Sequence, residues 1–143
     1  MMFWDSSALV PLVVRESTTG VAEEALRGDG TMVVWWGTVL ECRSAISRTL
    51  REGRFDDRTA ERALGVLRLL ADAWSEVLPG ERVRGIAGRI LMTHPLRAAD
   101  ALQLAAAVVW ADGDEPGCTF VCLDTRLRSA ARAEGFTVLP GSA

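Results

Sequence analysis

Short apolar segments rich in β-branched and aromatic residues alternate with longer segments of helical periodicity, and this alternation constrains the fold most. The predicted strands are residues 2–5, 31–36, 76–78, 119–123 and 136–139. Such alternation is typical of βαβ units, in which the strands form a parallel sheet covered by helices on both faces. Right-handed crossovers place every strand-to-helix junction at one edge of the sheet. Residues far apart in the chain, such as Asp5 and Asp124, are therefore expected to meet there.

The segments between the strands predict the helices. These span residues 6–14, 18–27, 38–53, 58–74 and 81–92, a segment from Pro95 to about Ala111, and residues 124–134. Pro95 suits the first turn of its helix because that turn needs no amide donor. The helix over 58–74 carries an apolar stripe at the spacing that faces a core. The members of this stripe are Ala63, Val66, Leu67, Leu70 and Trp74.

The composition fits one globular domain over residues 1–143. Hydrophobic residues make up 49% of the chain and charged residues 24%, and no apolar run approaches the ~20 residues of a membrane span. Asp5 lies early in an apolar amino terminus that has no basic residues, which does not match a signal peptide. We therefore expect a cytoplasmic protein without membrane association.

All sixteen basic residues are arginine. The absence of lysine excludes a P-loop NTPase, which needs a phosphate-binding lysine, and Schiff-base chemistry. An aspartate-nucleophile phosphatase is also disfavoured, because it needs a lysine and an acid where Ser7 stands. The net charge of −3 at first argues against nucleic acid as a partner. However, bound metal would neutralise some of the acids, and arginine makes bidentate contacts to phosphate.

Three cysteines give an odd count without a disulfide framework. The candidate ligands of a zinc site are Cys42, His94, Cys118 and Cys122. Paired CxxC spacing is absent, so we favour cysteine as a small buried hydrophobic residue. His94, the single histidine, lies next to Pro95 and is expected to be structural.

Four acidic residues lie where a strand pattern gives way to a helical pattern: Asp5, Glu41, Asp100 and Asp124. Each position also suits a helix start. Asp5 and Asp124 are good N-caps, and Asp100 lies in a first turn, where the helix dipole favours negative charge. Thr38 and Glu41 have the spacing of a capping box. Capping explains each acid singly, but it does not explain four of them at one predicted edge.

Carboxylates gathered at one edge would repel one another unless a cation lay among them. Ligands that are all oxygen suit a hard cation such as Mg²⁺ or Mn²⁺. Two such ions about 4 Å apart stabilise the attacking and leaving oxygens of a phosphodiester. A hydrolytic triad is not indicated, because Ser6 and Ser7 have no sequence-local base. These residues therefore predict metal-dependent chemistry on phosphates.

The pattern of these residues resembles that of the PIN domain family. The matching pieces are Asp5-Ser6-Ser7-Ala8-Leu9 after the opening strand, Glu41 in the helix after the second strand, the segment from Leu96 to Ala105 around Asp100, and Phe120-Val121-Cys122-Leu123-Asp124 followed by Arg126-Leu127. The segment around Asp100 is the most specific of these pieces. At this length the chain resembles a VapC-type toxin ribonuclease of a type II toxin–antitoxin system.

This resemblance implies a three-layer α/β/α sandwich with a central parallel sheet, and hydrolysis of RNA that depends on Mg²⁺ or Mn²⁺. In that mechanism, a water activated by the metal attacks the phosphorus in line. The catalytic and metal-binding residues that the resemblance implies are Asp5, Glu41, Asp100 and Asp124. Ser7 is implied as an auxiliary hydrogen-bonding residue. The resemblance also implies a homodimer and a small cognate antitoxin as a partner.

Two positions depart from the family pattern. Cys122 stands two residues before the last acid, where family members often carry Thr, Ser or Asn, and a thiol is a weak hydrogen-bonding partner. Pro11 lies in the first helix, where polar or basic residues are common. Since neither change removes an acid, a metal-dependent endoribonuclease is the leading hypothesis. The alternative is a catalytically weak PIN domain that serves as an RNA- or protein-binding scaffold.

Several side chains near the acids are candidates for contacts with RNA. Four arginines lie within a few positions of a proposed acid: Arg43, Arg97, Arg126 and Arg128. For each arginine alone, a solvated helix face or an ordinary ion pair is the simpler explanation. Trp35 and Trp36 are candidates for stacking on an unpaired base, and at least one of them is expected in the core.

Overall fold

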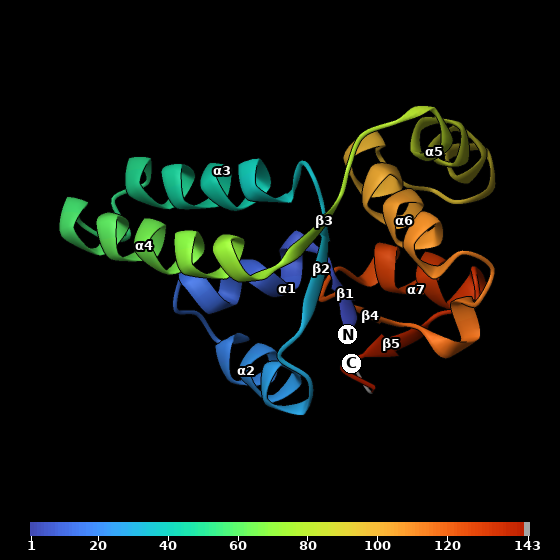
Figure 1. Ribbon diagram of the computed structural model, residues 1–143. Coiled ribbons are helices and arrows are strands. Elements are labelled where there is room, and N and C mark those ends of the chain that lie inside the picture. Colours follow the sequence, from blue (N-terminus) through green and yellow to red (C-terminus); the bar gives the residue numbers. More distant parts are fainter. Residues whose placement is uncertain (142–143) are drawn as a thin grey trace.

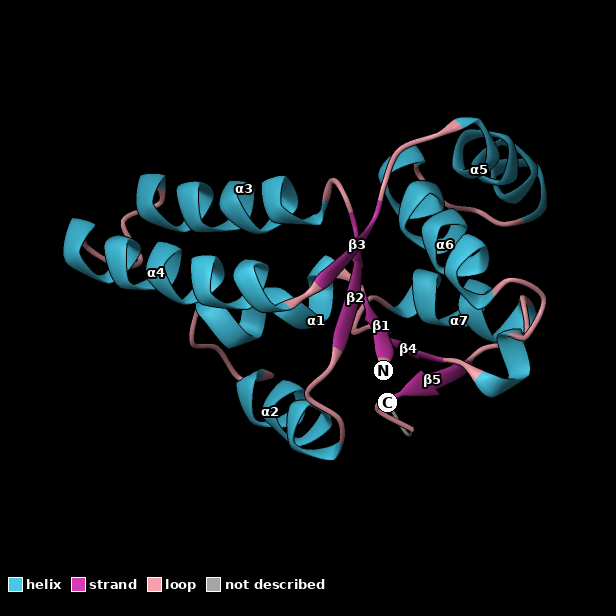
Figure 2. Cartoon of the chain, viewed as in Figure 1, coloured by secondary structure: helices cyan, strands magenta, loops and turns pink. Residues whose placement is uncertain are grey.

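The computed structural model describes residues 1–141. Over these residues, five strands form one parallel sheet in the order β3-β2-β1-β4-β5. The strands are β1 (Met2–Trp4), β2 (Met32–Trp35), β3 (Ser75–Val77), β4 (Thr119–Val121) and β5 (Thr137–Leu139). Figure 2 shows them running through the middle of the molecule. The predicted parallel sheet is confirmed, and most of its strands are shorter than predicted.

Helices cover both faces of the sheet, which confirms the three-layer α/β/α architecture (Figure 1). One layer contains α1 (Ser6–Val13), α2 (Thr19–Gly28), α3 (Thr38–Arg51) and α4 (Asp57–Ala73). The other contains α5 (Glu81–Thr93), α6 (Ala98–Ala111) and α7 (Thr125–Ala133). A short 3₁₀ helix, η1 (Glu115–Gly117), precedes β4. None of the helices within residues 1–141 has the length and hydropathy that a membrane span requires.

Alternate residues of the strands point toward the two helix layers and build two hydrophobic cores. Phe3 and Phe120 pack in the core on the side of α5, α6 and α7, and their rings stack with centroids 5.4 Å apart. Trp4 and Val121 pack in the core on the side of α1, α3 and α4. Because both faces of β1 and β2 are buried, these two strands are apolar throughout rather than alternating.

The segment before α6 differs from the prediction that Pro95 begins the helix. The amide of Leu96 donates to the carbonyl of His94 at 2.9 Å, which closes a tight turn around Pro95. The backbone is extended at Arg97, which is the N-cap residue, and α6 begins at Ala98. The prediction was wrong because the fixed φ of proline suits a tight turn as well as a first helical turn.

The capping box predicted for Thr38 and Glu41 is also wrong. The N-cap residue of α3 is Gly37, and no side chain caps this helix. The buried hydroxyl of Thr38 instead accepts a hydrogen bond from the amide of Gln103 on α6, at 2.8 Å. The hydroxyl of Thr38 therefore makes a tertiary hydrogen bond to α6 and does not cap the start of α3.

The apolar stripe of α4 is narrower than predicted. Ala63 and Leu67 are buried, as is Trp74, which follows the helix as its C-cap residue. Val66 is 39% exposed. Because α4 packs on α3 and α1, only part of its surface is covered.

Candidate active site

The structure brings the four predicted acids to one groove of about 480 Å³ at the carboxyl edge of the sheet. Asp5 directly follows β1, and Glu41 lies in the first turn of α3. Asp100 lies in the first turn of α6, and Asp124 follows β4 as the N-cap residue of α7. Strand ends and helix starts from distant parts of the chain therefore meet at one place, as the parallel topology predicts.

Size alone would point to another cavity. A larger one, of about 830 Å³, lies between α2 and the segments at the ends of β4 and β5, and apolar side chains dominate its lining. The smaller groove holds the concentration of titratable groups with altered pKa values. Because such groups mark functional sites more reliably than volume does, we assign the site to the smaller groove.

Asp5 is the most deeply buried of the four acids, with 2% of its surface exposed. Its Oδ2 atom accepts a hydrogen bond from the amide of Ser7 at 3.0 Å, so Asp5 caps α1 as predicted. Its Oδ1 atom is buried without a partner among the described residues. Burial, with smaller contributions from Glu41 and Asp100, raises the pKa of Asp5 to about 6 against the hydrogen bonds from Ser7.

Asp100 and Asp124 form the opposite wall of the groove. Partial burial, together with the charges of Asp124 and Glu41, raises the pKa of Asp100, and the nearby charge of Arg97 opposes this rise. Asp124 is exposed, and its Oδ1 atom accepts a hydrogen bond from the amide of Leu127 at 2.9 Å, which confirms it as an N-cap. The capping and electrostatic roles of these acids are therefore compatible.

Both carboxylate oxygens of Glu41 are held by hydrogen bonds. The hydroxyl of Ser6 donates to Oε2 at 2.7 Å, and the amide of Gln103 donates to Oε1 at 2.9 Å. The same Gln103 nitrogen donates to Thr38, and Gln103 is fully buried. The sequence interpretation missed this support. The available signal is a polar residue one helical turn after Asp100 within an otherwise apolar, alanine-rich helix.

Ser7 joins the start of α1 to the end of β4. Its hydroxyl accepts a hydrogen bond from the amide of Leu123 at 2.9 Å and lies 3.5 Å from the sulfur of Cys122. The thiol of Cys122 lies 3.6 Å from Oδ2 of Asp5. Burial raises the pKa of this thiol, so it stays protonated and acts as a weak donor toward Asp5. Cys122, the residue that departs from the family pattern, therefore contacts Asp5 as well as Asp124.

The donor set of the groove fits a divalent cation. Asp5 presents a buried oxygen without a partner, and neighbouring carboxylates contribute to the raised pKa values of Asp5 and Asp100. A cation in the groove would offset both the lost hydrogen bond and this repulsion. Within residues 1–141, no three His, Cys, Asp or Glu side chains converge closely enough to form a complete metal-binding cluster. Such a site would be completed by water, which Mg²⁺ retains readily.

The predicted arginines occupy different environments. Arg97 and Arg126 line an adjoining cavity of about 300 Å³ together with Pro95, Asp100 and Asp124. Arg43 is exposed on α3 and lines neither this cavity nor the groove.

Arg128 is only 3% exposed. Its guanidinium donates to the carbonyl of Cys122 at 2.8 Å and to the carbonyl of Pro140 at 2.6 Å. Arg128 therefore fastens the segment after β5 to the end of β4, and we remove it from the candidate RNA contacts.

The tryptophans considered for base stacking and the residues considered for a zinc site also differ in their surroundings. Trp35 is buried, whereas Trp36 is 49% exposed and meets the Trp35 ring edge-on with centroids 6.5 Å apart. Cys42 and Cys122 are buried among apolar side chains. The ring of His94 contacts Glu134 rather than a cysteine. Within residues 1–141, the three cysteines and His94 do not converge on one another as a group of metal ligands.

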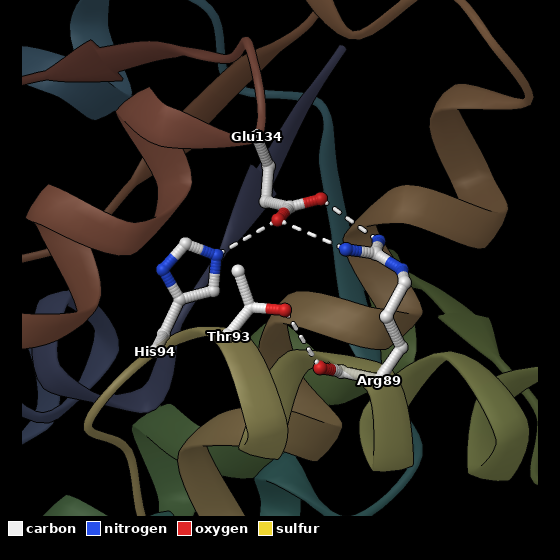
Figure 3. Close-up of polar contacts among 4 residues, drawn as sticks. All are labelled: Arg89, Thr93, His94 and Glu134. Atoms are coloured by element: carbon white, nitrogen blue, oxygen red, sulfur yellow. Dashed lines mark hydrogen bonds and ion pairs between the residues drawn. The ribbon is translucent and has the colours of Figure 1, made fainter.

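His94 belongs to a polar cluster beside the cavity that contains Arg97 (Figure 3). Its Nε2 atom lies 2.8 Å from Oε2 of Glu134, and both terminal nitrogens of Arg89 donate to the same carboxylate, at 2.8 and 3.2 Å. Hydrogen bonding from Arg89 is the main reason that the pKa of Glu134 is lowered. The cluster ties the end of α5 to the end of α7 and so anchors the turn at Pro95.

The whole chain is similar to known proteins. Ribonuclease VapC45 of Mycobacterium tuberculosis (strain CDC 1551 / Oshkosh) is 29% identical over 143 residues, which cover 98% of this chain and 95% of that protein. The crystal structure of Mycobacterium tuberculosis VapC20, described as a Sarcin-Ricin loop cleaving toxin, has a TM-score of 0.65 at 19% identity and covers 95% of this chain and 96% of that chain.

A toxin–antitoxin complex from Klebsiella pneumoniae has a TM-score of 0.63 at 14% identity, over 99% of this chain and 94% of that chain. At these identities the two solved structures establish the fold alone. A family model described as PIN domain matches residues 2–133. This match extends from β1 to the end of α7 and includes all four acids of the groove. The chain therefore belongs to the PIN domain family.

Proposed function

We propose that the protein is a metal-dependent endoribonuclease that hydrolyses RNA phosphodiester bonds as the toxin of a toxin–antitoxin pair. The observation that carries this proposal is the groove in which Asp5, Glu41, Asp100 and Asp124 meet, with a buried oxygen of Asp5 left without a partner. The similarity to Ribonuclease VapC45 over nearly the full length of both chains supports RNA as the substrate.

In this proposal the four acids hold Mg²⁺ or Mn²⁺. When bound, such a cation would activate water for attack on phosphorus and neutralise developing charge on the phosphate oxygens. Ser6 and Gln103 orient the carboxylate of Glu41 through the hydrogen bonds that they donate to its two oxygens. Asp5 is held at the start of α1 by the amide of Ser7, so its free Oδ1 atom is the oxygen available to a cation.

A small antitoxin and a second copy of the chain are the proposed protein partners. The Klebsiella pneumoniae structure, which is a toxin–antitoxin complex, supports the antitoxin. The homodimer follows from the resemblance to VapC-type toxins. We place the protein in the cytoplasm, where its proposed substrate is found.

One observation favours the alternative of a catalytically weak scaffold. No complete cluster of metal-binding side chains is present within residues 1–141, so the acids would have to bind a cation partly through water. A scaffold of this kind would bind RNA without cleaving it in Mg²⁺ or Mn²⁺, whereas the nuclease would cleave it.

The test is incubation of the purified protein with structured RNA in Mg²⁺, in Mn²⁺ and in a chelator. We expect cleavage only with a divalent cation, and loss of cleavage in Asp5→Asn and Asp100→Asn, which keep side-chain size but remove a charged ligand. Glu24→Gln, on the exposed surface of α2, is the matched control for removing a carboxylate. Cleavage that persists in both aspartate variants would overturn the mechanism.

A further inference from the structure

We propose that the RNA backbone crosses the acidic groove on a track with arginines at both ends, Arg48 at one end and Arg97 with Arg126 at the other. This inference rests on the proposed function and specifies how its substrate is held. It assigns a role to Arg48, which sequence proximity to the acids does not single out, and it excludes Arg43.

The track is defined by two adjoining cavities. The acidic groove of about 480 Å³ is lined by Arg48, and the neighbouring cavity of about 300 Å³ is lined by Arg97 and Arg126. Asp100 and Asp124 line both cavities, so they form the wall between them. Arg48 and the pair Arg97 and Arg126 therefore belong to different cavities that meet at these two acids. The proposal assigns the two sets of arginines to different, neighbouring phosphates of one strand.

Helical periodicity explains why Arg48 rather than Arg43 faces the groove. The residues of α3 that line it are Glu41, Ser44, Ala45 and Arg48, which recur every three or four positions on one face of the helix. Arg43 lies two positions after Glu41, which is more than half a turn away around the helix. Its charge therefore points away from the acids, although it is closer to Glu41 in sequence.

The opposite end of the track is positioned by the turn at Pro95. The turn leaves Arg97 as the N-cap residue of α6, three positions before Asp100. This turn follows directly after His94, which Glu134 holds together with Arg89 (Figure 3). The anchored turn reduces the conformational freedom that Arg97 would lose on binding phosphate.

The three arginines of the track are available for binding. Within residues 1–141, the side chains of Arg48, Arg97 and Arg126 make no hydrogen bond or ion pair, and all three residues are exposed. By contrast, the guanidinium of Arg128 is buried against two carbonyls. Glu16 adds a fifth carboxylate to the groove, so the acids repel phosphate when no cation is bound. RNA binding is therefore expected to need both a divalent cation and the arginines.

The test measures binding rather than cleavage. Fluorescence anisotropy of a labelled single-stranded RNA would be followed with Ca²⁺ in place of Mg²⁺, while gel electrophoresis verifies that the RNA stays intact. For each variant, the dissociation constant is measured over a range of salt concentrations. Removing one arginine that neutralises a phosphate of a single strand lowers the slope of log Kd against log salt concentration by about 0.7. The variants are Arg48→Gln, Arg97→Gln and Arg126→Gln, with Arg43→Gln as the control.

We expect a slope reduced by about 0.7 in Arg48→Gln and in Arg97→Gln, and by about 1.4 in the variant that combines them, because they contact different phosphates. Arg43→Gln should keep the slope of the parent protein. Arg48→Lys should also keep it, since it preserves the charge, and this variant separates loss of charge from damage to the fold.

A parent-like slope in Arg48→Gln or Arg97→Gln would overturn the track, as would an equal reduction in Arg43→Gln. A combined variant whose slope falls no further than that of either single variant would place both arginines on one phosphate, which also contradicts the proposal. The proposed nuclease activity fails separately. If the parent protein binds RNA with the expected slopes but cleaves none in Mg²⁺ or Mn²⁺, the track stands and the catalytic function does not.

Discussion

The amide of Gln103 donates to the carboxylate of Glu41 at 2.9 Å and so joins α6 to α3 beneath the acidic groove. Gln103 is fully buried, and its carbonyl oxygen has no partner within the described residues. A buried amide with one unsatisfied atom costs free energy, so the gain in stability from burial does not by itself explain this side chain. Gln103 is therefore a positioning residue for Glu41.

Replacing Gln103 should weaken metal binding without removing an acid. In Gln103→Leu, the carboxylate of Glu41 keeps only one of its two donors, and removal of this kind of support typically lowers metal affinity or activity by about 10- to 100-fold. Titration of the purified variant with Mn²⁺, followed by calorimetry, measures the affinity directly. Unchanged Mn²⁺ affinity in a folded Gln103→Leu protein would show that Glu41 does not need this orientation.

The buried carboxyl of Asp5 predicts an unusual dependence of stability on pH in metal-free protein. Its pKa is raised from 3.8 to about 6, so between these values the folded protein retains a proton that the unfolded chain has released. Stability therefore falls as pH rises through this window, by up to about 3 kcal/mol. Asp5→Asn removes the penalty and keeps the helix cap.

Urea unfolding in a chelator would measure this effect. Metal-free Asp5→Asn should be more stable than the parent protein at pH 7.5, by up to about 3 kcal/mol, and the difference should shrink toward pH 4. A stability difference that stays constant from pH 4 to pH 7.5 would contradict the raised pKa of Asp5.

A divalent cation should stabilise the folded protein because the acids converge only in the folded state. At a concentration 100 times the dissociation constant, the stabilisation amounts to about 2.7 kcal/mol. We expect Mn²⁺ to raise the melting temperature of the parent protein and of Glu24→Gln, but to leave that of Asp100→Asn nearly unchanged. Equal shifts in all three proteins would place the cation outside the groove.

Replacing Glu134 should affect both the stability of the protein and RNA binding at the Arg97 end of the track. Glu134→Gln removes the bidentate ion pair with Arg89 and the charge facing His94, which should lower stability by about 1–3 kcal/mol at neutral pH. Because the pKa of Glu134 is lowered in the folded protein, this contribution is present above pH 4.5 and declines as pH falls below that value.

The same variant should bind RNA more weakly, since the turn that presents Arg97 is no longer anchored. Its slope of log Kd against log salt concentration should stay close to that of the parent protein, because Arg97 keeps its charge. Thermal unfolding and anisotropy on one preparation would separate the two effects. RNA binding equal to that of the parent protein would limit Glu134 to a purely stabilising role.

The sheet and the meeting of the acids follow from local sequence pattern. Strands that are buried on both faces are typically apolar, and helical segments between successive strands favour a parallel arrangement. Asp5 and Asp124 come together because each directly follows a strand, and parallel strands end at a common edge. These conclusions need no knowledge of which helix face meets which neighbour.

The roles of the residues around the acids depend on tertiary contacts, which the local sequence pattern does not reveal. Thr38 has the spacing of a capping residue, yet it bonds to Gln103, 65 positions away in the chain. Arg128 lies only two positions after Arg126 on α7, but its guanidinium is buried against two backbone carbonyls, whereas Arg126 lines the cavity beside Asp124. Short-range pattern places a residue on a helix. Packing between distant segments then determines whether its polar atoms meet solvent, a carbonyl or an acid of the groove, because a buried polar group without a hydrogen-bond partner costs free energy.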